Sequence, residues 1–155
     1  MTGPGVTLTL DDALDSAAGG GPDPRNGSGF TDGRVTARDL QVVVNGLWQS
    51  GVEAMSINGM RLTSRSSIRF AGSALLVDFR PLTRPYVVTA IGDPQALEPH
   101  FATTVAGGYL SALVDNYAIR AEFAAADSLT VPAATGLALS SAQILRAPTS
   151  GATAR

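Results

Sequence analysis

Residues 36–51, TARDLQVVVNGLWQSG, form the longest segment of this sequence with a clear helical period. Apolar side chains recur three or four residues apart, along one face of a helix: Leu40, Val43, Val44, Leu47 and Trp48. Thr36 is a good N-cap with Asp39 completing a capping box, and Gly51 is a natural stop. The segment predicts a helix that packs this face on a core, with Trp48 in that core.

Short segments with strand-like patterns surround this helix. In residues 6–10 apolar and polar side chains alternate, which is typical of a half-buried strand. The other segments expected as strands are apolar or β-branched and are separated by turn residues: 52–57, 60–62, 67–72, 74–79, 86–91, 117–123 and 128–132. Asn58-Gly59 predicts a tight turn between the first two of these, because both residues tolerate positive φ.

Two further helices are expected after residue 92. Asp93 and Pro94 supply an N-cap and a first-turn proline, while Pro99 is expected to end this helix early or to kink it. A second short helix is expected over residues 108–117. Helices between groups of antiparallel strands predict an α+β fold, a two-layer sandwich of one mixed or antiparallel sheet with two or three helices packed on it.

The chain is long enough for one domain with a sizeable core. It has 155 residues, of which 45% are hydrophobic and 15% are charged, and this composition excludes a wholly disordered chain. We assign residues 1–134 to a single α+β domain that contains a flexible glycine-rich loop at 17–34. Residues 135–155, rich in Ala, Thr, Ser and Gly, are expected to form a low-complexity tail.

Composition excludes several kinds of site. The chain has no cysteine and one histidine, His100, which excludes thiol chemistry and a multi-histidine metal site within one chain. The net charge of −2 gives no overall field that attracts nucleic acid. No apolar run reaches the roughly 18–20 residues that span a bilayer. We therefore expect no metal, no cofactor and no nucleic-acid partner.

Catalytic patterns are weak in this sequence. A GxSxG nucleophile elbow is absent. Asp11 and Asp12 could bind a divalent ion if a third oxygen ligand joined them, and His100 follows a proline on an expected short helix, where a surface position is favoured. A hydrolase that uses Asp11, Asp12 or His100 is the least favoured hypothesis, and we expect that the domain is not an enzyme.

The most polar stretch between the expected strands is SINGMRLTSRSSIRFAG, residues 56–72. It contains Arg61, Arg65 and Arg69, and arginine offers a planar set of donors suited to carboxylate or phosphate. Turn residues exclude a helix that would align all three. In strands, Arg69 is expected to face away from the other two.

Two interpretations of this stretch remain open. Its side chains form a recognition patch for an oxyanion or a partner, or the arginines hold the turn by bonding to Glu53, Asp78 or backbone carbonyls. The residues of the candidate patch are Asn58, Arg61, Thr63, Ser64, Ser67 and Arg69.

Four blocks of the sequence carry a resemblance to a bacterial family. They are GPGV followed by a strand that ends in Asp-Asp (3–12), the long block 40–72 with NGLW and GVEAMSING, PYVVTAIGDPQAL (85–97) and LTVPA (129–133). Together they are similar to the YlxW/YlxX-type bacterial domain of unknown function, whose members are often labelled "division initiation protein". This resemblance brings no established reaction.

The resemblance also implies a place for the domain in a longer protein. A membrane anchor and a coiled coil would precede Gly3-Pro4-Gly5, so the domain would be the C-terminal, extracytoplasmic part of a cell-membrane protein and could form a homo-oligomer through that coiled coil. We expect a non-enzymatic interaction domain of the cell envelope, related to division or envelope assembly, with an envelope or division protein as its partner. The alternative is a binder of an anionic small molecule or wall polymer.

Overall fold

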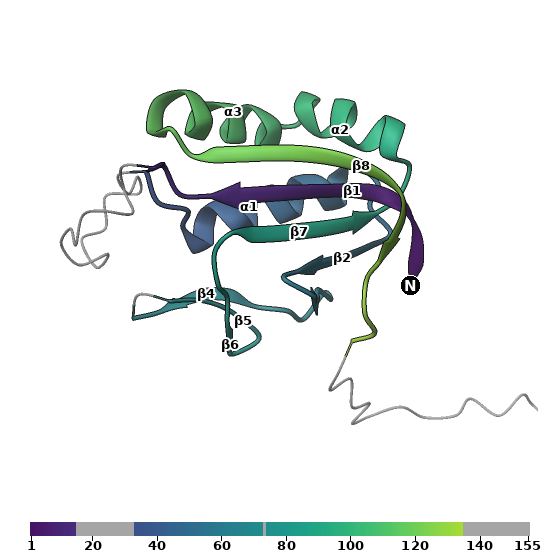
Figure 1. Cartoon of the computed structure of the whole chain (residues 1–155), viewed down its shortest axis with the longest axis horizontal. Coiled ribbons are helices and arrows are strands. Elements are labelled where there is room, and N and C mark those ends of the chain that lie inside the picture. The colour runs from purple at the N-terminus through teal and green to yellow at the C-terminus, as the bar shows by residue number, and fades with distance from the viewer. Residues whose placement is uncertain (15–32, 73, 135–155) are drawn as a thin grey trace, which may run out of the picture.

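The structure, a computed structural model, describes residues 1–14, 33–72 and 74–134 (Figure 1). Most of the predicted glycine-rich loop and the whole predicted tail lie outside the described residues.

The described residues form strands and helices in an α+β arrangement, which confirms the predicted fold class. The elements are β1 (Thr2–Asp11), α1 (Ala37–Gln49), β2 (Ala54–Ile57), β3 (Met60–Arg61), β4 (Ile68–Ala71), β5 (Ala74–Val77), β6 (Arg80–Pro81), β7 (Tyr86–Ile91), α2 (Pro94–Thr103), α3 (Val105–Tyr117) and β8 (Arg120–Thr130).

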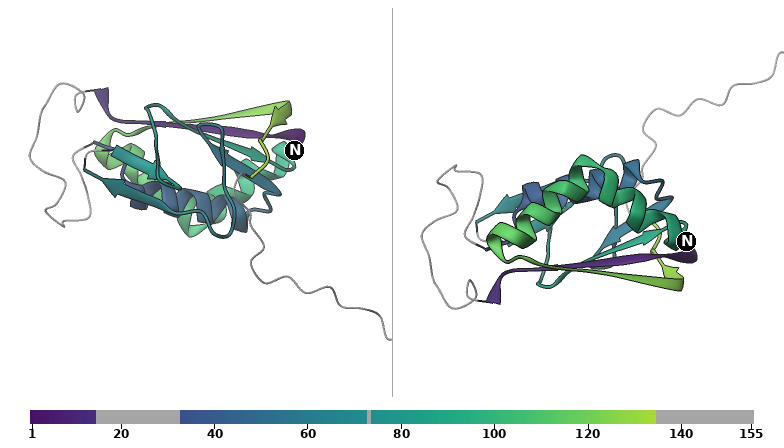
Figure 2. Two further views of the ribbon diagram at one scale, coloured as in Figure 1. Left: turned by 90° about the horizontal axis from the view of Figure 1, so that it is seen from below. Right: turned by 90° about the horizontal axis from the view of Figure 1, so that it is seen from above.

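The main sheet has five antiparallel strands in the order β3-β2-β7-β1-β8. β1 pairs with β7 on one side, where Leu8 lies opposite Val88, and with β8 on the other, where Leu8 lies opposite Phe123. The three helices pack on one side of this sheet (Figure 2). The predicted two-layer arrangement is therefore present.

The strands between residues 68 and 81 form a second, three-stranded sheet in the order β4-β5-β6 instead of joining the main one. It lies at the end of the domain opposite α2, α3 and β8 (Figure 1). The separation begins after β3, where the amide of Ser66 donates to the carbonyl of Thr63 at 3.1 Å and turns the chain. A strand of only two residues, Met60–Arg61, offers the main sheet no edge for further pairing.

The core lies between the main sheet and the helices. Val6, Leu8 and Leu10 of β1 are fully buried there, as their alternation predicts. α1 adds Leu40, Val43, Val44 and Leu47, but Trp48 is 36% exposed. The prediction that Trp48 lies in the core is wrong. A helix turns by about 100° per residue, so Trp48 is rotated by that angle from the buried Leu47 and lies past the edge of the buried face.

The caps of α1 agree with the sequence. Thr36 Oγ1 accepts from the amide of Asp39 at 3.2 Å, and Asp39 Oδ2 accepts from the amide of Thr36 at 2.7 Å, so the capping box satisfies two donors at the helix start. Gly51 has a φ of 95° just after the helix, a conformation that favours glycine.

The prediction of two separate strands near the C-terminal end of the domain is wrong, and so is the expectation that Pro99 ends its helix early. The segments expected as two strands, 117–123 and 128–132, form the single strand β8, because residues 124–126 include no glycine or proline and pair with β1. Pro99 neither ends α2 nor marks its boundary. Pro99 and Gln95 are both exposed, so the carbonyl that loses its helical donor can bond to water.

Gly46 sets the distance between α1 and the other two helices. A Cβ there would lie 2.3 Å from the Cβ of Ala106 and 2.9 Å from the Phe101 ring. We expect Gly46→Ala to lower the free energy of unfolding by about 1–3 kcal/mol through overpacking. Gly108→Ala is the control, since a Cβ at Gly108 meets nothing within 4 Å. This substitution should raise the free energy of unfolding by about 0.5–1 kcal/mol, because alanine favours a helix over glycine. Urea denaturation measures both, and destabilisation by Gly108→Ala alone would contradict this packing.

Tyr109 joins α3 to the start of α1 through a hydrogen bond from its hydroxyl to Asp39 Oδ1 at 2.6 Å. Burial, this hydrogen bond and the Asp39 charge together raise the pKa of Tyr109 from 10.0 to about 12. The unfolded chain therefore loses this proton at a lower pH than the folded protein does. The contribution of Tyr109 to the free energy of unfolding is fully present below pH 10 and is lost as the pH rises through 12.

We expect Tyr109→Phe to weaken this loss of stability at alkaline pH, measured by thermal melts from pH 8 to 11.5. Part of the loss should remain, because burial also raises the pKa of Tyr86. Identical pH profiles for the two proteins would show that Tyr109 does not carry the effect.

Candidate functional site

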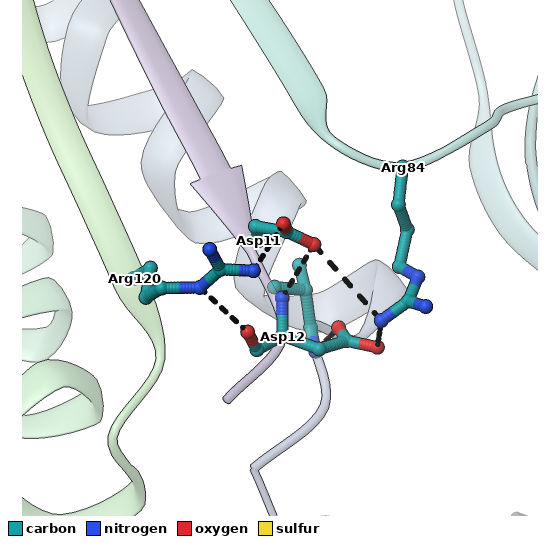
Figure 3. A network of polar contacts seen from close by, with 5 residues as sticks. Asp11, Asp12, Arg84 and Arg120 are labelled. Atoms are coloured by element: carbon teal, nitrogen blue, oxygen red, sulfur yellow. Dashed lines mark hydrogen bonds and ion pairs between the residues drawn. The ribbon is translucent and has the colours of Figure 1, made fainter. Parts of the chain in front are cut away.

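A dense polar network ties together the ends of three strands of the main sheet (Figure 3). Asp12 Oδ2 accepts from Arg84 Nη1 at 2.5 Å, and its Oδ1 accepts from the amide of Val35 at 2.9 Å. Arg120 forms an ion pair with Asp11 and donates from Nε to the carbonyl of Asp12 at 3.1 Å. The network fixes the end of β1 against the beginnings of β7, β8 and the segment that leads into α1.

This network bears on the hypothesis that Asp11 and Asp12 are catalytic or bind a metal. Each carboxylate already bonds to a guanidinium, and a metal would have to displace it. Over residues 1–14, 33–72 and 74–134 there is no group of three or more His, Cys, Asp or Glu suited to a metal ion. His100 is exposed on α2. The geometry gives Asp11 and Asp12 a structural role.

A cavity of about 760 Å³ opens between β3, the turn after it, the β5–β6 hairpin and residues 132–134. Three arginines line it: Arg61, Arg65 and Arg80. Thr63 and the apolar side chains of Met60 and Val77 contribute to its wall. We take this hollow as the candidate functional site and call it the arginine cavity.

The wall formed by residues 132–134 depends on long-range contacts. Val131 is fully buried against Ala54 and Ile91, and it exchanges two backbone hydrogen bonds with Met1, of 2.7 and 2.8 Å. The next residue, Pro132, accepts a hydrogen bond of 3.1 Å from Arg61 Nη1 through its carbonyl. The chain that leaves β8 thus closes one side of the cavity.

Among the described residues, Asp78 is the one acidic residue that lines the arginine cavity, and its oxygens are already bonded. Ser66 Oγ and the amide of Ser67 donate to its two carboxylate oxygens, each at 2.8 Å. Within the described residues, neither Arg65 nor Arg80 forms an ion pair. The cavity therefore carries an excess of positive charge that suits an anionic group.

The β5–β6 hairpin has an unusual turn. Its two central residues, Asp78 and Phe79, have φ values of 48° and 68°, whereas the β2–β3 hairpin forms the same kind of turn with Asn58 and Gly59 at 46° and 76°. Asn-Gly is the pair that such turns prefer, and a bulky residue with positive φ is strained. Phe79 is 75% exposed, with the Arg69 guanidinium 5.0 Å from its ring centre.

The six predicted patch residues have different roles in the structure. Arg61 and Thr63 line the cavity. Asn58 holds the β2–β3 turn against β7 and the residues before it, because its side chain donates to the carbonyl of Thr83 and accepts from the amide of Val87, both at 2.7 Å.

The other three patch residues lie outside the cavity lining. Ser64 is exposed, Ser67 uses its amide on Asp78, and Arg69 stacks on Phe79. Of the three kinds of partner considered for these arginines, Arg61 bonds to a backbone carbonyl. Glu53 is exposed and forms no ion pair with an arginine within the described residues.

Sequence reasoning missed Phe79, Arg80 and residues 132–134. Residues 78–79 read as the end of a strand because phenylalanine is not a turn residue.

The fold and the cavity define a small α+β domain with an antiparallel sheet, three helices on one face and an arginine-lined hollow at one end. The chain belongs to the bacterial family of unknown function DUF881, whose profile matches residues 1–143. This membership confirms the resemblance expected from the sequence.

Individual relatives agree with this assignment. The chain is 37% identical over 140 residues to UPF0749 protein Rv1823 of Mycobacterium tuberculosis, covering 86% of this chain and 43% of the relative. It is 36% identical over 123 residues to UPF0749 protein YlxW of Bacillus subtilis, covering 79% and 49%. It spans less than half the length of these two relatives.

A solved structure shares the fold. The crystal structure of an uncharacterized conserved protein from Mycobacterium tuberculosis superposes with a TM-score of 0.67 at 27% identity, covering 94% of this chain and 90% of that one. Within the described residues, no helix has the length and apolar character needed to cross a membrane.

We expect Asp12→Asn to lower the free energy of unfolding by about 2 kcal/mol, because it replaces a charge-assisted bond to Arg84 at the junction of β1 and β7. Asp115→Asn is the matched control. Asp115 is exposed on α3, so its change should stay within about 0.5 kcal/mol. Urea denaturation compares the two variants, and an equal effect would mean that the network does not fix the strand ends.

Proposed function

We propose that this chain is a non-enzymatic interaction domain of a membrane-anchored cell-envelope protein, and that its arginine cavity captures an anionic group of its partner. The partner is an envelope or division protein. The observation that carries this proposal is the excess of guanidinium groups in the cavity, since Arg61, Arg65 and Arg80 face one carboxylate whose oxygens are already bonded.

The donors in the cavity suit a planar or tetrahedral oxyanion. Each guanidinium presents a fork of N–H groups that can bind a carboxylate or phosphate at two points. Among the residues that the structure describes, the Arg65 guanidinium has no bond to displace before it binds, and Arg61 uses one donor on the carbonyl of Pro132. Thr63 lies in the same wall. Little reorganisation is needed, which favours binding.

The envelope location rests on the family resemblance. In Rv1823 and YlxW more than half of the length lies outside the matched region, so a longer protein of this kind has room for the anchor and coiled coil that the resemblance implies. A partner at the membrane would then meet this domain at a high effective concentration.

The test is capture from detergent-solubilised envelope at low salt, with this domain as bait. We expect one protein retained by wild type to be lost from Arg61→Ala/Arg65→Ala and kept by Arg38→Ala, which removes an exposed arginine of α1. Loss of two charged hydrogen-bond donors should weaken binding at least about tenfold, and calorimetry on the purified pair measures this factor. The thermal melts should stay close to wild type.

A wall polymer rich in phosphate is the second candidate ligand, because the cavity is large and carries three guanidinium groups. Titration with inorganic phosphate and with purified wall polymer separates it from a protein partner. If the domain binds the polymer and this binding weakens steeply with salt, the ligand is the polymer and not a protein. Equal capture by wild type and Arg61→Ala/Arg65→Ala would remove both versions of the proposal.

A further inference from the structure

The two ends of the domain carry opposite charges. Residues 58–83, which include the three-stranded sheet, hold four arginines and one aspartate, whereas residues 93–127, which form α2, α3 and most of β8, hold five carboxylates and one arginine. These ends lie at opposite edges of the main sheet, the basic end next to β3 and the acidic end at β8 (Figure 1). The single arginine of the acidic end, Arg120, is already paired with Asp11.

The basic end presents an exposed aromatic side chain, Phe79, which we call the knob. Phe79 stands at the tip of the β5–β6 hairpin with 75% of its surface exposed, and Arg69 and Arg80 lie beside it, the first stacked on its ring. Its backbone occupies a conformation that glycine would adopt at less cost. A strained, exposed aromatic residue indicates a contact that compensates for the strain.

The acidic end contains an apolar groove of about 240 Å³ between α2, α3 and β8. Phe101 and Leu110 are buried in its floor, Phe123 lies partly buried at its side, and Val114 is 38% exposed at its edge. Glu98 also lines the groove. An apolar hollow with a carboxylate beside it complements a phenyl ring flanked by arginines.

We propose that the occupant of this groove is Phe79 of a second copy of the chain, with its arginines facing Glu98. The contact joins two different surfaces, so it is head-to-tail, and an open assembly of any length keeps one free knob at one end and one free groove at the other. Successive additions build an open row or a ring.

Charge complementarity selects a second copy in this orientation. Two acidic ends facing each other would bring carboxylates together, and such like charges repel, so a symmetric pairing along the exposed edge of β8 is disfavoured. Phe79 and Arg80 also line the arginine cavity, whereas the groove residues lie at the other end of the domain (Figure 1). A substitution in the groove therefore tests this contact and leaves the cavity lining unchanged.

The experiment is sedimentation of the 155-residue chain at low salt over a range of concentrations. We expect the average mass of wild type to rise with concentration beyond a dimer and to fall when salt is added. Phe79→Gly removes the knob and Val114→Arg blocks the groove, so each variant alone should remain monomeric. Mixed together they should form a one-to-one dimer and stop, since one intact knob meets one intact groove.

Two controls keep the result interpretable. The melting temperatures of Phe79→Gly and Val114→Arg should lie within a few degrees of wild type, because both positions are exposed. Val114→Arg should also retain the envelope partner that Arg61→Ala/Arg65→Ala loses, which separates this inference from the proposed function.

Three results would overturn the head-to-tail contact. Wild type could stay monomeric at every concentration, the two variants could fail to form a dimer when mixed, or a single variant could still assemble. If wild type is monomeric and instead binds vesicles of anionic phospholipid in a manner lost in Phe79→Gly, the knob belongs to a membrane surface.

Discussion

The pairing of β1 with both β7 and β8 is the constraint on which the rest of the domain depends. β1 buries Val6, Leu8 and Leu10 under the helices, and its two neighbours come from the second half of the chain. Thr2 lies opposite Thr130, so the main sheet is complete only when the two ends of almost the whole described chain have been brought together. Such long-range pairing carries a large entropic cost that the buried side chains must offset.

The ion pairs of Asp11 and Asp12 act at the end of this strand. They hold β7 and β8 in register where β1 leaves the sheet (Figure 3). At the other end of β1, Val131 exchanges hydrogen bonds with Met1 and sends residues 132–134 across to Arg61. The central strand therefore also builds one wall of the arginine cavity, although no residue of β1 lines it.

The small sheet and the arginine cavity beside it combine features that cost stability and that the fold does not require. Arginines cluster around a single carboxylate, and a phenylalanine occupies a turn position suited to glycine. The β2–β3 hairpin achieves the same turn with Asn58-Gly59, so the strain at Phe79 is not imposed by hairpin geometry. Departures of this kind concentrate where a surface makes contacts with other molecules. Both proposals of function and assembly start from this part of the molecule.

The sequence by itself determined most of the elements and the family, because these depend on local period, caps and recognisable blocks. The alternation in residues 6–10, the capping box at Thr36 and the Asn58-Gly59 turn each have a short-range cause. The tertiary structure decided which strands share a sheet, that Pro99 stays within its helix, that β8 is continuous, and that Arg61, Arg65 and Arg80 meet around one cavity. Those outcomes depend on packing and pairing between residues far apart in the chain, and no local pattern in a single sequence records them.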